Sequence, residues 1–102
     1  MITIIALLTI RNAEAFDQFE RQAAAIMESH GGRIDLAFRP RAPTAQTPKV
    51  DEVHVLKFPD HDAFDRYRSD DRLLALSTLR QKAISQSTVY VAGTEVDYSA
   101  PA

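Results

Sequence analysis

The chain of 102 residues has no cysteine and no tryptophan, and it has only three glycines. The absence of cysteine excludes disulfide bonds, thiolate catalysis and cysteine-ligated metals. The 12 basic and 14 acidic side chains give a net charge of -2, so no overall basic field attracts nucleic acid or anionic lipid, and we expect neither partner. The apolar start MITIIALLTI is too short to span a bilayer and has no basic lead, so we expect a cytoplasmic protein.

The composition that is present is that of a globular protein, with 45% hydrophobic and 25% charged residues. This length suits one compact domain with a modest core, which a partner subunit would help to stabilise. We therefore expect a single domain over residues 1–98 and a short tail over residues 99–102.

Apolar periodicity and helix caps predict six elements. They are, in order, a strand over 2–10, a helix between Asn12 and Gly31-Gly32, strands over 33–39 and 51–58, a helix after Asp60 that breaks and restarts at Ser69-Asp70-Asp71, and a strand over 88–96 with a bulge or bend at Gly93. This order predicts an α+β, ferredoxin-like split βαβ fold (βαββαβ), in which two helices cover one face of a four-stranded antiparallel sheet.

The pattern along the strands predicts which faces are buried. Ile34, Leu36 and Phe38 alternate with polar or small residues, which predicts one buried face. The first strand is apolar at both parities, so we expect both of its faces to be covered, the second by another copy in a two-fold homodimer. The third strand has apolar residues at both parities, so the sequence does not decide which of its two faces is buried.

Three short motifs resemble a known family. They are HGGRIDL, VHVLKFPDHDAFDRYRSDD and LSTLRQKA, within residues 28 to 96. Together they resemble the domain-of-unknown-function 1330 family of the dimeric α/β-barrel superfamily. The residues that match its pattern are Gly31, Gly32, Arg33, Phe58, Pro59, Ala63, Phe64, Tyr67 and Arg80.

The resemblance implies a dimeric α/β barrel but no particular reaction. Related superfamily members include cofactor-free monooxygenases, muconolactone-type isomerases, dehydratases and haem-binding enzymes. The chain departs from the family pattern in its long Pro-rich stretch over residues 40–50. It also has Ser69-Asp70-Asp71-Arg72 where the family has Ser-Pro-x-Tyr, so its ligand can differ from those of relatives.

His54 and Arg80 are the two candidate catalytic residues. His54 lies in a strand and shares the parity of Leu56 and Phe58, where an imidazole can act as acid or base. Arg80 borders an apolar helix face, where a guanidinium can bind a substrate carboxylate. The alternatives are a packed strand histidine and an arginine paired with an aspartate of the Pro59–Asp62 turn.

Tyr67 and Arg39 are the candidate ligand-binding residues. Tyr67 shares a helix face with Ala63 and Phe64, where core packing is the alternative. Arg39, together with Arg41 and Lys49, could form a cationic lip, whereas solvated loop charges are the alternative.

The sequence predicts no metal and no cofactor, because His30, His54 and His61 fall in three different elements without metal-ligand spacing. Two functional interpretations stay open. One is a site that binds or turns over a small organic acid or phenolic compound by cofactor-free acid/base or oxygenase chemistry. The other is a non-catalytic dimeric ligand-binding or stress-associated module.

Overall fold

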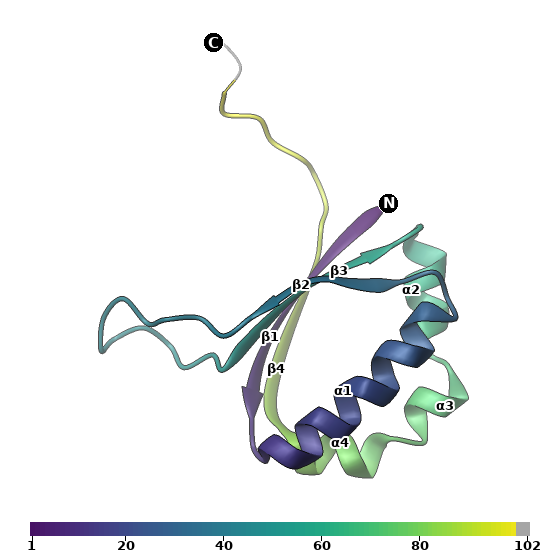
Figure 1. Ribbon diagram of the computed structural model, residues 1–102. Coiled ribbons are helices and arrows are strands. Elements are labelled where there is room, and N and C mark those ends of the chain that lie inside the picture. The colour runs from purple at the N-terminus through teal and green to yellow at the C-terminus, as the bar shows by residue number, and fades with distance from the viewer. Residues whose placement is uncertain (100–102) are drawn as a thin grey trace.

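The computed structural model describes residues 1–99 of the chain (Figure 1). Its elements are β1 (Ile2–Ile10), α1 (Ala13–Glu28), β2 (Arg33–Phe38), β3 (Glu52–Phe58), α2 (His61–Arg68), α3 (Asp71–Leu74), α4 (Ser77–Ala83) and β4 (Ile84–Val91).

The four strands form one antiparallel sheet in the order β2-β3-β1-β4. All helices lie on the same side of this sheet, which we call the helix face (Figure 1). This arrangement confirms the predicted ferredoxin-like α+β fold. No helix of the described residues is long and apolar enough to cross a membrane.

The predicted helix caps are confirmed. The Asn12 side chain accepts a hydrogen bond from Ala15 N at the start of α1, and Asp60 accepts one from Ala63 N at the start of α2. Asp70 caps α3 in the same way, so the Ser69-Asp70-Asp71 segment is a helix break followed by a restart. Such caps satisfy backbone N–H groups that have no partner inside the helix.

Two glycines shape the turn between α1 and β2. Gly31 has a φ of 76°, and a Cβ built on it would lie 2.9 Å from Pro59. A Cβ on Gly32 would overlap the ring of Phe58. The Gly-Gly and Phe-Pro motifs are therefore in direct contact, and the absence of two side chains lets the turn lie on the end of β3.

The core between sheet and helices consists of two clusters. One joins Ala6 and Leu8 to α1 and to Ala83, and the other joins Ile4 and Phe58 to α2 and to Met27 at the end of α1. Ile4 and Phe58 are fully buried. Burial of each such side chain contributes about 1.5–3 kcal/mol relative to exposure.

β2 does not present its three apolar side chains on one face, so the predicted alternation is wrong. Ile34 pairs with Leu56 on the helix face, whereas Leu36 pairs with Val55 on the opposite face. The register shifts between Ile34 and Leu36 because of a bulge, and an extra residue reverses the side-chain parity beyond it.

The last strand begins and ends earlier than predicted, at Ile84 and Val91 instead of residues 88 and 96. The polar run that opens it resembles a loop in sequence, but it pairs with the end of β1 from Leu8 to Ile10. Gly93 lies beyond the strand, and the irregularity in this pairing falls between Thr9 and Ile10. The predicted bulge at Gly93 is therefore wrong.

The side of the sheet opposite the helices, which we call the open face, has an apolar centre, where Ile5 and Leu7 of β1 pair with Val55 and Val53 of β3. β3 places His54, Leu56 and Phe58 on the helix face, and Val53 and Val55 on the open face, which answers the question left by the sequence. Within residues 1–99 no helix covers the open face.

Two segments extend away from this body (Figure 1). The first, which we call the arm, comprises residues 39–51 between β2 and β3. The second, which we call the tail, comprises residues 92–99 after β4. The predicted tail began at residue 99, and its residues 100–102 lie outside the described residues.

Candidate functional site

β3 carries His54 into the space between the sheet and the helices. The side chain is only 5% exposed, although it is polar. Its neighbours across the sheet are Ala6 on β1 and Ala37 on β2. Because both neighbours are small, the sheet leaves open space beside the imidazole.

One ring nitrogen of His54 is bound by a carboxylate of its own strand. His54 Nε2 lies 2.6 Å from Glu52 Oε2. The other oxygen of Glu52 accepts a hydrogen bond from Arg39 Nε at 3.2 Å. The carboxylate therefore holds the imidazole with one oxygen and an exposed guanidinium with the other.

The second ring nitrogen of His54 faces a carboxyl group from α1. Glu20 Oε2 lies 3.7 Å from His54 Nδ1, beyond hydrogen-bond distance. Burial raises the pKa of Glu20 above its usual value, and the nearby Glu52 raises it further, whereas His54 and Arg80 lower it. Glu20 therefore keeps its proton to a higher pH than an exposed glutamate does.

Arg80 reaches the same space from α4. Its Nη2 donates a hydrogen bond to Ser87 Oγ on β4 at 2.9 Å. The expected alternative, an ion pair with an aspartate of the Pro59–Asp62 turn, is not formed. Because its partner is neutral, the guanidinium charge remains available to an anion at the edge of the cavity.

Tyr67 forms part of the wall from α2. Its ring centroid lies 5.4 Å from that of Phe58. Burial, followed by the charge of Glu20, raises the pKa of Tyr67 to about 12. The phenol is therefore protonated at neutral pH and can donate a hydrogen bond to a ligand.

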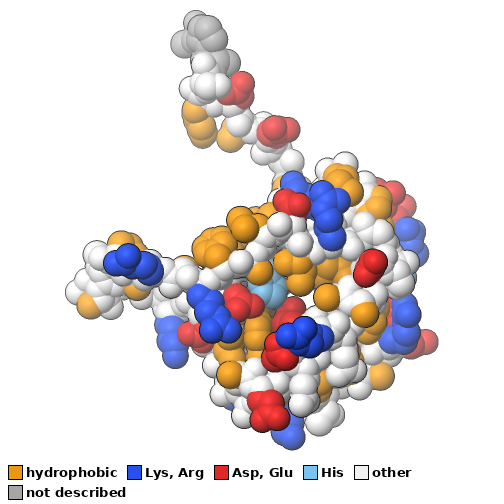
Figure 2. All heavy atoms as spheres, in the orientation of Figure 1, with side chains coloured by type: hydrophobic (Ala, Val, Ile, Leu, Met, Phe, Trp, Pro, Cys, Tyr) orange, Lys and Arg blue, Asp and Glu red, His pale blue; other side chains and the backbone are white. Residues whose placement is uncertain are grey.

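These side chains line one cavity of about 320 Å³ between the sheet and the helices. On the viewer's side of the molecule, a histidine is visible in a recess bordered by acidic and basic side chains (Figure 2). Most of the lining is apolar, and its polar members are Glu20, His54, Tyr67, Arg68, Arg80 and Ser87. A mainly apolar cavity with a few convergent polar groups is typical of a small-molecule site.

The structure thus brings together three of the four residues singled out from the sequence. His54, Arg80 and Tyr67 line the cavity, whereas Arg39 lies outside it and contacts Glu52. The predicted role of Arg39 in ligand binding stays a prediction.

Sequence reasoning missed Glu20 and Glu52. Glu20 follows Phe16 by four residues and precedes Ala23 by three, which is the spacing of the buried helix face. Glu52 shares the parity of His54 in the strand. Both signals are present in the sequence. Each is weak, because neither spacing nor parity shows that the carboxyl group lies near His54.

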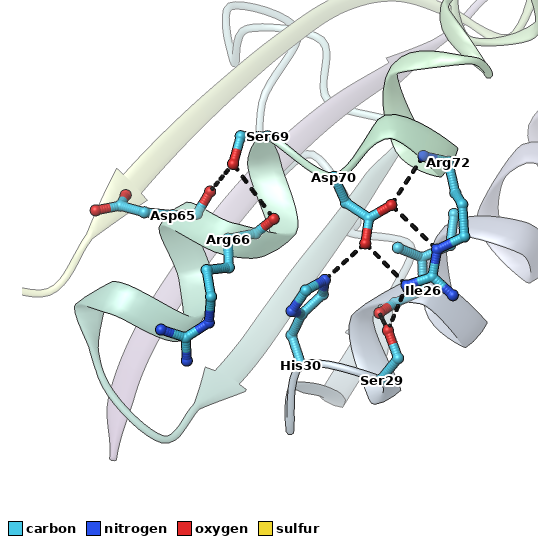
Figure 3. A network of polar contacts seen from close by, with 8 residues as sticks. All are labelled: Ile26, Ser29, His30, Asp65, Arg66, Ser69, Asp70 and Arg72. Atoms are coloured by element: carbon cyan, nitrogen blue, oxygen red, sulfur yellow. Dashed lines mark hydrogen bonds and ion pairs between the residues drawn. The ribbon is translucent and has the colours of Figure 1, made fainter.

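The other two histidines, His30 and His61, do not line this cavity. His30 Nε2 lies 2.8 Å from Asp70 Oδ2, and Arg72 binds the same carboxylate and also Ser29 (Figure 3). Hydrogen bonds from Arg72, followed by that from His30, hold the pKa of Asp70 well below its usual range. This network connects the end of α1 to the start of α3, and His61 opens α2 at the surface.

Comparison with models of protein families assigns the chain to a family. Residues 3–94 match the model of a domain of unknown function, DUF1330. The chain belongs to the DUF1330 family. A search of curated proteins finds no match.

Solved structures of similar fold include proteins both with and without a stated activity. RPA0582 from Rhodopseudomonas palustris, of unknown function, has a TM-score of 0.78 at 18% identity, covering 94% of this chain and 83% of that one. A ferredoxin-like DABB protein from Mesorhizobium loti has a TM-score of 0.68 at 16% identity, covering 93% and 97%. SnoaB from Streptomyces nogalater, a cofactor-independent oxygenase, has a TM-score of 0.65 at 17% identity, covering 97% of each chain. At these identities the likeness establishes the fold alone.

Proposed function

We propose that this DUF1330 protein binds and turns over a small organic acid or phenolic compound by cofactor-free acid/base chemistry. The observation that carries the proposal is the convergence of His54, Glu20, Tyr67 and Arg80 on one largely apolar cavity. An apolar ring fits the walls, and an ionisable oxygen fits the polar groups.

His54 is the proposed base. In the neutral tautomer that donates Nε2–H to Glu52, the lone pair is on Nδ1, which lies on the side of Glu20. A substrate hydroxyl or acidic C–H near Nδ1 would transfer its proton there. The anion that forms would be stabilised by the Arg80 guanidinium and by the O–H group of Tyr67.

The same anion could also be the species that is oxygenated, so the proposed chemistry includes an oxygenase reaction. Dioxygen, as second substrate and oxidant, would form a C–O bond with a carbon of the phenolate or enolate, and the proton taken up by His54 would convert the resulting peroxide anion to a hydroperoxide, with no bound cofactor. The likeness in fold to a cofactor-independent oxygenase supports testing this reaction, although the low identity carries no residue roles.

Ligand binding is the first test. Chemical shifts of the cavity methyl groups, such as those of Leu56 and Ile84, are recorded against 4-hydroxybenzoate, benzoate and phenol. We expect saturable shifts, and we expect Arg80→Gln to weaken binding of the two acids about tenfold. Arg66→Gln, on the exposed side of α2, is the matched control. No saturable shift with any probe, or equal losses in both variants, would overturn the proposed anion site.

Turnover is the second test, using a panel of phenols and organic acids in air with product and oxygen uptake monitored. We expect His54→Gln to abolish conversion and to change the melting temperature by no more than a few degrees. Conversion that persists in this variant would exclude His54 as the base. Loss of folding would be resolved by Glu20→Gln, which alters the facing acid without removing the buried ring.

The open face supports a second proposal, a homodimer in which two sheets pack face to face. Large side chains lie exposed there, among them Leu36, Phe38 and Tyr90, and a contiguous apolar surface of this kind favours association. Analytical ultracentrifugation should give a dimer for the natural chain and a monomer for Val55→Glu. A monomeric natural chain would refute the pairing.

A further inference from the structure

A groove of about 420 Å³ lies where the arm leaves the open face. Leu7 and Val53 of the sheet form its floor, and Pro40, Pro48 and Val50 of the arm form part of its wall. Most of this lining is apolar. The groove is separate from the His54 cavity, because it lies on the opposite face of the sheet.

The groove is bordered by cations. Arg41 and Lys49 belong to its lining, and Arg41 has no ion-pair partner within residues 1–99. Lys49 Nζ lies 3.9 Å from Asp51 Oδ1, and its side chain is 77% exposed. An apolar groove with basic borders fits an extended segment that carries both apolar and acidic side chains.

The tail is a segment of that composition. Val96 is 64% exposed and Tyr98 is 93% exposed, and Glu95 precedes them. Acidic and apolar side chains alternate along the tail, and basic and apolar side chains occur together on the arm (Figure 2). The two projecting segments are thus complementary in charge, and each carries apolar surface.

The arm and the tail lie at opposite ends of β1. Asp51 N, at the base of the arm, donates a hydrogen bond to Leu8 O, whereas Ala92 N, at the base of the tail, donates one to Thr3 O. These two points are separated by about 17 Å of strand. A two-fold axis perpendicular to the strands would exchange the two ends, so the tail of one copy would lie beside the arm of the other.

We propose that the tail of one copy binds in the arm groove of a second copy. Val96 and Tyr98 contact the apolar lining, and Glu95 faces Arg41. The eight tail residues can extend about 26 Å, which is enough to cross the groove. This inference rests on the proposed sheet-to-sheet pairing and adds an exchanged segment to it.

Disulfide trapping tests the exchange, because the natural chain has no cysteine. Two chains of different mass are coexpressed, one carrying Ala42→Cys in the groove and the other carrying Val96→Cys in the tail. In the control pair, Gln22→Cys replaces Ala42→Cys. Under mild oxidation we expect about tenfold more disulfide between positions 42 and 96 than between positions 22 and 96. The reason is that docking of the tail raises the effective concentration of its thiol at the groove. Gln22 is exposed on α1, away from the open face.

Charge reversal tests the specificity of the contact. Glu95→Arg should lower the yield about three- to fivefold, and adding Arg41→Glu on the other chain should restore it. Equal yields in the Ala42→Cys and Gln22→Cys pairs would overturn the inference. So would a disulfide within one chain that carries both Ala42→Cys and Val96→Cys, because the occupant would then be the chain's own tail.

Ultracentrifugation separates the two proposals. A dimer without the disulfide between positions 42 and 96 would refute only the exchange of tails. A monomer would refute both the pairing and the exchange. The proposed catalytic cavity is untouched by either result, because the groove and the tail share no lining residue with it.

Discussion

His54 Nε2 lies 2.6 Å from Glu52 Oε2, and both side chains come from the helix face of β3. The contact gives Nε2 of the buried imidazole a hydrogen-bond partner. The other nitrogen, Nδ1, faces Glu20 in the cavity. A polar side chain that is 5% exposed would otherwise be costly in an apolar environment. The pair therefore serves the stability of the fold and the proposed chemistry together.

Glu52→Ala should change the tautomer of His54. With the carboxylate present, we expect the ring proton on Nε2 and the lone pair on Nδ1, and without it a mixture of the two tautomers. Long-range ¹H–¹⁵N correlation spectra distinguish these states. The variant should also lose about 1–3 kcal/mol of unfolding free energy, because a buried N–H loses its acceptor. The exposed Glu28→Ala is the control, and an unchanged ring spectrum in Glu52→Ala would contradict the assignment.

Glu20 should make the protein less stable as the pH rises. Burial raises the pKa of Glu20 from its ordinary 4.5, so the folded state binds this proton more tightly than the unfolded state. Its contribution is most favourable below the unfolded pKa and is lost as the pH rises through the folded pKa. The free energy of unfolding of Glu20→Gln, relative to the natural chain, should therefore increase as the pH rises above about 4.

Urea unfolding at several pH values measures this difference. Glu14→Gln, in the exposed first turn of α1, is the matched control and should show no such trend. A relative stability of Glu20→Gln that falls over the same pH range would show that the folded state favours the ionised carboxylate.

Tyr67 should ionise only in strong base. Burial and the charge of Glu20 raise the pKa of Tyr67 to about 12. The ultraviolet titration of the natural chain minus that of Tyr67→Phe should show one tyrosinate step near this value. Tyr90→Phe, on the open face, should leave that step in place. A step near the ordinary value of 10 would mean that the wall of the cavity is open to solvent.

Gly32→Ala should weaken the contact between the α1–β2 turn and β3. Its new methyl group would overlap the Phe58 ring, which is fully buried, so we expect a loss of about 1–3 kcal/mol in unfolding free energy. Gly93→Ala is the matched control, because a Cβ there has no atom within 4 Å. Equal unfolding midpoints for the two variants would refute the overlap.

Local sequence signals predicted much of the fold. Asn12 and Asp60 mark helix starts because their side chains accept hydrogen bonds from nearby backbone N–H groups. Ser69-Asp70-Asp71 marks the helix break for the same reason. Alternation in β3 placed His54 beside Leu56, although only the structure showed which parity is buried.

The missed features depend on contacts between distant segments. The β2 bulge reverses the direction of Leu36 through pairing with β3, and the polar start of β4 becomes a strand through pairing with β1. The residue preferences within either segment cannot predict the bulge or the start of β4, because the hydrogen bonds of a sheet are formed with a partner strand.

The sequence by itself determined the order of elements, the caps and the candidate residues His54, Tyr67 and Arg80, because each follows from periodicity, side-chain chemistry or a short motif. Only the tertiary structure decided that these residues, which come from β3, α2 and α4, share one cavity with Glu20 of α1. Their convergence depends on strand register and helix packing, which join segments far apart in the chain. The same packing leaves the open face, the arm and the tail available to a second copy.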